Sequence, residues 1–331
     1  MSQVRRRQFL IATGVLLLEA TNAVFSQDLK SGKIYRIGCV PGGPMPPREH
    51  QWAEFRKGLT ELGYVEGKNI VLEFRVPQEG IRADDLIADL VRQNVDVMVV
   101  SNGFHAQSAK RISKTIPIVL TGAVDPVASG LVASLARPEG NVTGLSLYNS
   151  ELGGKRLELL RELLPKSRRI AILINRDDPS NTPQLKAVQD AGRSMKVEII
   201  PVEARAPEDL RRAFQAAAKR HAEGLIVASS GLFYGQRTQI MDLAQHGHLP
   251  AIWPWESFGG FGALLVYGPS DTDNYHRAAY YVDRILKGAK PGDLPVEQPT
   301  QVKLVVNLTT ARTLKLSIPK SLILRADRVI E

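Results

Sequence analysis

Tyr-Arg-Ile-Gly-Cys-Val at residues 35–40, followed by Gln-Trp-Ala-Glu-Phe-Arg-Lys-Gly-Leu-Thr-Glu-Leu at residues 51–62, decides the fold of this chain. The first run is short and apolar, which is typical of a buried strand. The second run places Trp52, Phe55 and Leu59 on one face of a helix. Gly63 follows, at a position where helices commonly end. Together the two runs predict one strand and one helix of an α/β protein.

The same alternation continues along the chain. Further strands are expected at residues 69–76, 96–100, 116–120, 141–147, 169–174, 197–202, 224–228, 251–253, 263–267 and 303–307. Further helices are expected at residues 84–92, 106–113, 125–136, 151–164, 183–194, 208–221, 236–245 and 275–286, with two short helical pieces in the tail. Apolar strands separated by helices are typical of parallel sheets covered on both faces. Because the pattern breaks near residues 146–151, we expect two such sheets.

The first 26 residues have the layout of an export signal. Three arginines at residues 5–7 precede an apolar run at residues 11–18 and a small-residue stretch at residues 20–26. Arg-Arg-x-Phe-Leu is similar to a twin-arginine signal, and an arginine-rich Sec signal is the alternative. The apolar run is about half as long as a membrane-spanning helix requires. We therefore expect the signal to be removed and the mature protein to work in the periplasm.

The composition is that of a globular protein with enough chain for two domains. The formal net charge of the 331 residues is +9. Lysines and arginines are spread along the sequence and do not alternate with aromatic residues, which argues against a nucleic-acid groove. Cys39 is the only cysteine, so the chain forms no internal disulfide. Its apolar neighbours predict a buried structural thiol.

Polar and small residues follow the expected strands of the first series, where open α/β sheets bind their ligands. Ser101 and Asn102 lead into a helix, and they suit either a carboxylate or a plain helix cap. Asp125 either caps the helix expected after it or meets a ligand amine. The proline-rich residues 41–47 either cradle a ligand or form only a rigid turn. The candidate binding residues of this series are Ser101, Asn102, Gly103, Thr121, Gly122, Ala123 and Asp125.

The strands of the second series also end in polar or aromatic residues. Asn175 follows one strand, and Ser229 and Ser230 follow another. Trp253 ends a third strand, with Trp255 close behind. These tryptophans either form an aromatic wall for a ligand or pack between domains. Asn175, Ser229, Ser230 and Trp253 are the candidate binding residues of this series.

No catalytic or cofactor motif accompanies these residues in the sequence. A glycine-rich dinucleotide turn, a Walker lysine and a nucleophile elbow are absent. His246 and His248 lack an evident third metal ligand. We therefore expect a binding cleft without catalytic residues, metal or cofactor.

Several segments carry a resemblance to a known family. They are Phe55-Arg56-Lys57-Gly58-Leu59, Leu62-Gly63-Tyr64-Val65-Glu66-Gly67-Lys68-Asn69-Ile70, Ile116-Pro117-Ile118-Val119, Asp125-Pro126-Val127-Ala128-Ser129-Gly130-Leu131-Val132, Asn141-Val142-Thr143-Gly144, Tyr267-Gly268-Pro269 and Asp293-Leu294-Pro295-Val296-Glu297-Gln298-Pro299. In this order they resemble ABC-transporter substrate-binding proteins of the type I periplasmic-binding fold. The similar branch includes tryptophan- and tyrosine-type binding proteins.

The resemblance implies two Rossmann-like lobes joined by three crossings, with a ligand between them. Residues 33–145 and 266–298 would form the N-terminal lobe, and residues 146–265 and 299–331 the C-terminal lobe. The resemblance adds Tyr267 to the candidate binding residues. Ser229 and Ser230 stand where amino-acid binders of this branch often carry an aspartate.

The function implied is that of a monomeric solute-binding component of an ABC importer. It would capture a small organic solute, such as an aromatic or other amino acid or a carboxylate, by closing its lobes. It would then deliver the solute to a membrane permease and its ATPase, and would meet the membrane only through that permease. A solute sensor for a membrane receptor is the alternative, with a nucleotide-dependent enzyme a more distant one.

Overall fold

The computed structural model describes residues 32–42, 49–78, 81–147, 152–299 and 301–331. Three predicted features lie outside the described residues. They are the export signal, most of the proline-rich loop, and the end of the segment near residues 146–151 where the strand–helix pattern breaks. Residues 34–331 form one compact unit, which contains two separate sheets. No helix in the described part of the chain is long and apolar enough to span a bilayer.

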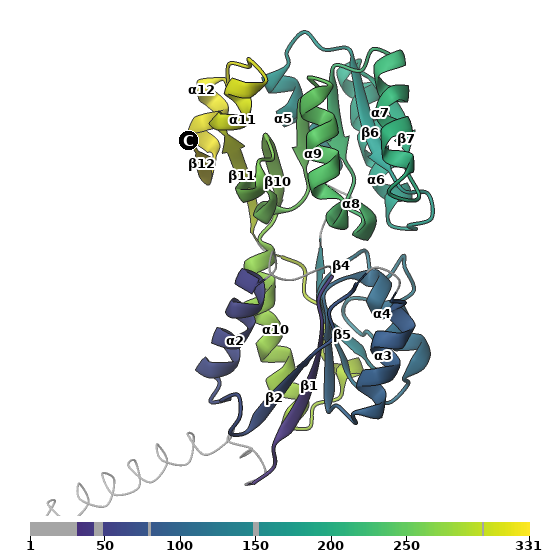
Figure 1. Ribbon diagram of the computed structural model, residues 1–331, viewed down its shortest axis with the longest axis vertical. Coiled ribbons are helices and arrows are strands. Elements are labelled where there is room, and N and C mark those ends of the chain that lie inside the picture. Colours follow the sequence, from purple (N-terminus) through teal and green to yellow (C-terminus); the bar gives the residue numbers. More distant parts are fainter. Residues whose placement is uncertain (1–31, 43–48, 79–80, 148–151, 300) are drawn as a thin grey trace, which may run out of the picture. The chain divides into compact units, whose positions relative to one another are not determined.

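The first sheet has the strand order β2-β1-β3-β4-β5, and all its neighbouring strands are parallel. Its strands are β1 (Tyr35–Val40), β2 (Ile70–Phe74), β3 (Val97–Val100), β4 (Ile118–Val124) and β5 (Val142–Leu147). Helices α2 (Glu49–Glu61) and α10 (Asp271–Leu286) pack together on one face, and α3 (Ala83–Arg92) and α4 (Gly103–Ile112) on the other (Figure 1). We call this sheet and its helices the first half.

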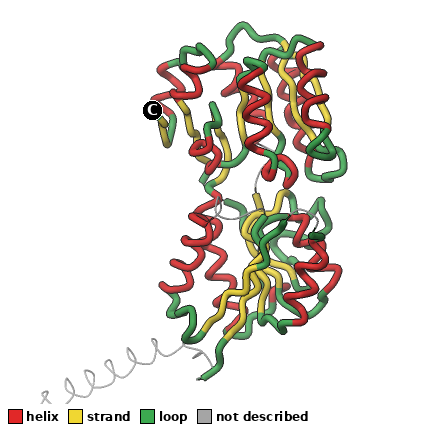
Figure 2. Tube along the Cα trace, viewed as in Figure 1, coloured by secondary structure: helices red, strands yellow, loops and turns green. Residues whose placement is uncertain are grey.

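The second sheet has the order β12-β11-β10-β9-β8-β6-β7 and is parallel except where β10 meets β11. Its strands are β6 (Arg169–Ile174), β7 (Glu198–Glu203), β8 (Gly224–Val227), β9 (Ala251–Trp253), β10 (Leu265–Pro269), β11 (Val302–Asn307) and β12 (Arg328–Ile330). In Figure 2 its strands form a layer with helices along its faces. We call this sheet and its helices the second half.

The helices of the second half are mostly short. They are α5 (Leu152–Leu163), α6 (Asn181–Met195), α7 (Asp209–Lys219), α8 (Gly231–Gly235), α9 (Arg237–His246), α11 (Leu308–Thr313) and α12 (Lys320–Arg325). Two 3-10 helices complete the described elements, η1 (Glu256–Phe261) after β9 and η2 (Pro291–Asp293) after α10. Helix α5 packs against α6 and α12, and α7 packs against α9.

The expected fold class is confirmed: two mostly parallel α/β sheets are covered by helices. Each sheet buries its own apolar core. Cys39 lies in β1 and is fully buried, and this burial raises the pKa of its thiol. The prediction of a buried structural cysteine is therefore confirmed.

The expected helix at residues 125–136 is wrong, because this segment forms successive turns. The side chain of Asp125 accepts a hydrogen bond from the backbone N–H of Ala128, which starts the first turn. Gly130 then has a φ of +69°, which takes the backbone out of helical geometry. Leu131 is still buried in the core. The apolar residues of this segment are therefore spaced by the packing of the turns and not by a helix.

One expected domain boundary also differs from the structure. We assigned residues 266–298 to the first lobe, but β10 pairs with β9 and β11 in the second sheet. The chain therefore returns to the first half after Pro269, where α10 begins. The other domain boundaries stay predictions.

Gly144 in β5 is required by close packing of the backbone. Its φ is +118°, and a Cβ atom there would lie 2.4 Å from the carbonyl oxygen of Leu120. The β4–β5 register shifts between Leu120 and Ala123 at this approach. A side chain at residue 144 would push β5 away from β4, the strand that carries Thr121.

Candidate functional site

Both sheets change winding direction at an internal strand, and predicted binding residues lie there. In the first sheet the change falls between β1 and β3, and Ser101 follows β3 directly. In the second sheet it falls between β6 and β8, which are followed by Asn175 and by Ser229. Such switch points form crevices at the carboxyl ends of the strands. The topology therefore places candidate residues of both halves where this fold class binds ligands.

Ser101 and Asn102 are held in place by specific hydrogen bonds. The Asn102 side chain caps α4 by accepting from the backbone N–H of His105 at 2.8 Å. Ser101 Oγ accepts from the Tyr275 hydroxyl at 2.7 Å. Asn102 is therefore a helix cap, as one of the two interpretations predicted. The first backbone N–H groups of α4, beginning at Gly103, have no partner within the helix, as at any helix start. This end of β3 can bind a carboxylate or another small acceptor.

Thr121 lies on β4, next to β3, and carries an unusual polar atom. Its side chain is 2% exposed, and its Oγ1 has no hydrogen-bond partner among the described residues. A buried hydroxyl without a partner costs stability, so a ligand that supplied a partner would recover that cost. Gly122 and Ala123 continue the strand, and a Cβ atom at Gly122 would lie 3.2 Å from Leu147. Of these three residues, Thr121 offers the polar group for a ligand.

Asp125 serves as a cap. Its Oδ1 accepts from the backbone N–H of Ala128 at 3.0 Å, and its backbone has a φ of +41°. The expected helix cap is wrong, because the segment after Asp125 is not helical and Asp125 caps a turn instead. The other interpretation, a contact with a ligand amine, stays a prediction.

In the second half, two side chains that the sequence did not single out fix the candidate loops. Asn181 donates to the carbonyl of Ser229, and its Oδ1 accepts from the backbone N–H of Asn175. Gln184 donates to the same carbonyl and accepts from the backbone N–H of Ser229 at 2.7 Å. Ser230 is buried at the start of α8. Helix α6 therefore ties the loops after β6 and β8 into one unit.

Trp253 lies inside the core of the second half and is 1% exposed. Its ring contacts Phe258 at a centroid distance of 5.5 Å. Trp255 is also buried, between Phe258 and Tyr234. This aromatic cluster stabilises the end of β9 within the second half, and it is not the packing between domains that we offered as one interpretation. A ligand contact of Trp253 stays a prediction.

Tyr267 is half-buried in β10, and its carbonyl accepts from Arg156 Nε at 2.8 Å. Arg156 lies in α5 and is fully buried, and this burial lowers its pKa to about 9. Next to Tyr267, a Cβ atom at Gly268 would lie 1.9 Å from the carbonyl oxygen of Pro254. The Tyr-Gly-Pro segment therefore packs directly on the loop that follows Trp253.

A hydrogen bond connects the strand-end regions of the two halves. Gln51 in the first turn of α2 donates to the Tyr234 hydroxyl on α8 at 3.2 Å. Both side chains are buried. Helix α2 comes after β1, and α8 comes after β8. The carboxyl edges of the two sheets therefore meet at this pair.

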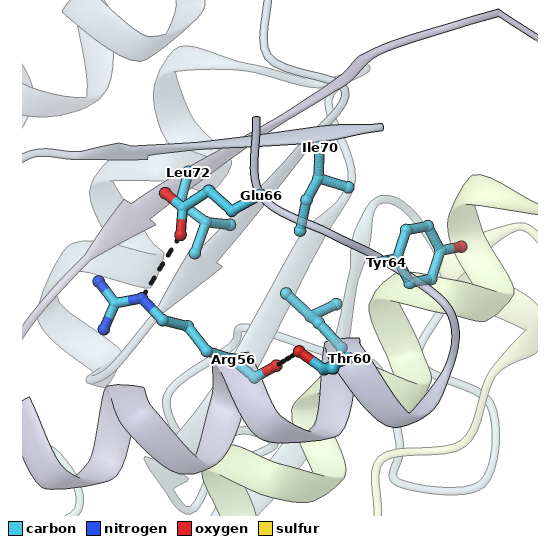
Figure 3. A pocket seen from close by; sticks show the side chains of 7 residues that line it. Arg56, Thr60, Tyr64, Glu66, Ile70 and Leu72 are labelled. Atoms are coloured by element: carbon cyan, nitrogen blue, oxygen red, sulfur yellow. Dashed lines mark hydrogen bonds and ion pairs between the residues drawn. The ribbon is translucent and has the colours of Figure 1, made fainter. Parts of the chain in front are cut away.

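Two cavities lie in the described part of the chain, and neither is lined by a predicted binding residue. A cavity of about 130 Å³ lies between α2 and the start of β2, at the opposite edge of the first sheet (Figure 3). Its Arg56 is ion-paired with Glu66, and its Thr60 hydroxyl donates to a backbone carbonyl. A second cavity of about 300 Å³ is lined by the start of α10 and residues 297–299, beside the crossings between halves.

The two α/β sheets, with polar loops at their carboxyl edges, define a protein of the type I periplasmic-binding fold. A family model described as ABC transporter substrate binding protein matches residues 46–330. The chain therefore belongs to the ABC transporter substrate-binding protein family.

The chain is also similar to individual proteins. The chain is 28% identical over 261 residues to a tyrosine-binding protein of Clostridioides difficile strain R20291, covering 78% of this chain and 75% of the relative. It matches the structure of a conserved domain protein from Vibrio cholerae with a TM-score of 0.83 and 26% identity, over 90% and 100% of the two chains. A Streptococcus pneumonia ABC domain in complex with L-Trp shares the fold, with a TM-score of 0.78, 21% identity and coverage of 89% and 100%.

Proposed function

We propose that this protein is the extracytoplasmic solute-binding component of an ABC importer. It captures a small organic solute between its two halves and delivers it to a membrane permease, whose ATPase supplies the energy. The observation that carries the proposal is the pair of polar strand-end regions that meet at Gln51 and Tyr234. The closed arrangement is favoured by the additional contacts that a bound solute makes with both halves.

We propose an aromatic amino acid as the solute class. The carboxylate would bind at Ser101 and the start of α4, where hydroxyl and backbone N–H donors lie together. The unpartnered hydroxyl of Thr121 lies on the neighbouring strand and would gain a partner. The tyrosine-binding relative supports this choice of ligand class.

Binding is tested with the mature protein and a defined set of ligands. L-tyrosine, L-tryptophan, L-leucine and D-glucose are compared by isothermal titration and by thermal shift. A ligand at 100 times its dissociation constant stabilises the folded state by about 2.7 kcal/mol. We expect stabilisation by the aromatic amino acids and none by glucose. Stabilisation by glucose alone would contradict the ligand class, and turnover of any bound ligand would contradict a binding role.

Transport is tested in the host cell. Deletion of the gene is expected to abolish high-affinity uptake of the ligand identified by titration, and expression of the intact chain is expected to restore it. Normal uptake in the deletion strain, combined with a lost transcriptional or chemotactic response, would instead support the sensor alternative.

A further inference from the structure

Tyr275 is a buried side chain that reaches the candidate carboxylate site from a distant part of the sequence. It lies in the first turns of α10, directly after the chain returns from the second sheet. Its hydroxyl is 2.7 Å from Ser101 Oγ, across 174 positions of sequence. Tyr275 is 3% exposed and Ser101 is 9% exposed. The bond between them is therefore shielded from water.

The direction of this hydrogen bond decides what Ser101 can do. A serine hydroxyl has one proton to donate and two lone pairs that can accept. The two hydroxyls share one hydrogen bond, and when Tyr275 is its donor, one lone pair of Ser101 Oγ is occupied and the Ser101 proton is left for another acceptor. In that arrangement Ser101 acts as a donor towards a further acceptor. A carboxylate oxygen is the acceptor that forms the strongest bond with such a donor.

The aromatic ring of Tyr275 is itself fixed by its surroundings. It meets Trp52 edge-on, at a centroid distance of 5.1 Å and an interplanar angle of 85°. Trp52 makes two further edge contacts, with Phe55 and Phe74. A ring held in this way has few alternative positions, so its hydroxyl stays directed at Ser101.

We propose that Tyr275 is a positioning residue, which holds the Ser101 hydroxyl as a preoriented donor for the carboxylate of the solute. This inference rests on the proposed function, because it assigns a role within the same site. It makes one specific claim beyond that function: Tyr275 contributes to affinity through Ser101 and not by direct contact.

A double-mutant cycle tests this claim. Tyr275→Phe removes the hydroxyl and keeps the ring against Trp52. In the wild-type background it is expected to weaken binding of L-tyrosine or L-tryptophan by about 2- to 10-fold. In the Ser101→Ala background the same substitution is expected to change the affinity very little, because the hydroxyl it positions is gone.

Tyr280→Phe is the matched control. Tyr280 lies on the same helix, where its ring packs under the guanidinium of Arg277 at 3.9 Å. Loss of its hydroxyl is expected to leave affinity unchanged. Thermal unfolding of each variant verifies that the fold is retained.

Equal losses from Tyr275→Phe in both backgrounds would overturn the positioning role, as would no loss in the wild-type background. Those outcomes leave the proposed function standing, since the wild-type protein still binds. If the wild-type protein binds no aromatic amino acid, the proposed ligand class is wrong. The proposed role of Tyr275 is then wrong as well.

Discussion

The side-chain amide of Gln51 donates a hydrogen bond to the hydroxyl of Tyr234, 183 positions further along the chain. Gln51 belongs to the helix after β1, and Tyr234 to the short helix after β8. Tyr234 is backed by Trp255 and Phe258, with centroid distances of 5.2 and 4.8 Å. One half thus presents an amide, and the other presents a hydroxyl on a packed aromatic cluster.

We expect Tyr234→Phe to speed ligand release. The substitution removes the acceptor of the Gln51 amide and retains the ring. A neutral hydrogen bond contributes about 0.5–1.5 kcal/mol, so the dissociation rate should rise by about 2- to 10-fold if the bond forms only when the halves are together. Stopped-flow fluorescence measures this rate. An unchanged rate would show that the bond does not contribute to closure.

Trp253→Ala should act mainly on stability. Its side chain is buried in the core of the second half, and removal of such a ring costs about 3–5 kcal/mol. Urea unfolding measures the loss. Trp253→Phe is the milder companion variant, for which we expect near-normal affinity. A tenfold weaker affinity of the Phe variant at normal stability would instead indicate that Trp253 contacts the ligand.

Asp125→Asn should leave both stability and affinity close to wild type. An asparagine side chain can still accept from the backbone N–H of Ala128, and it tolerates a positive φ. Asp125→Ala should lose about 1 kcal/mol of stability, because the hydrogen bond to the backbone N–H of Ala128 is removed. If Asp125→Asn weakens binding of an amino acid tenfold while the melting temperature is unchanged, the carboxylate contacts the ligand amine.

Glu297→Gln should lower stability in a pH-dependent way. Both carboxylate oxygens of Glu297 accept from Arg277, at 2.7 and 2.9 Å, and these bonds hold its pKa below the ordinary 4.5. A carboxyl with a lowered folded-state pKa stabilises the protein above its unfolded-state value. That stability is lost as the pH falls through the folded-state pKa. Both side chains are partly exposed, so the difference at pH 7 should not exceed about 1 kcal/mol.

Urea unfolding of wild type and Glu297→Gln at pH 7 and at pH 3 checks this dependence. The difference between the two proteins should be smaller at the lower pH, and it should vanish below the folded-state pKa of Glu297, where the wild-type carboxyl is also neutral. High salt should shrink the difference at pH 7. A difference that is the same at both pH values would mean that the ion pair is not its source.

Much of the architecture was predictable from local sequence patterns. Residues 35–40 and 51–62 form the expected strand and helix, because apolar spacing reports directly which face of an element is buried. The loops at the carboxyl ends of strands were also predictable, because the end of each apolar run marks where a strand ends. The segment at residues 125–136 misled us, since buried Leu131 in a series of turns produces the same spacing as a helix.

The sequence by itself determined that the chain folds into two α/β sheets and that polar loops follow their strands, because these features depend on neighbours within a few residues. Only the tertiary structure decided that Tyr275 donates to Ser101, that Gln51 meets Tyr234 and that Trp253 is buried. Each of these depends on strand order and on where distant segments pack. The identity of a residue does not reveal which distant residue it meets, because that partner is selected by the packing of the whole chain.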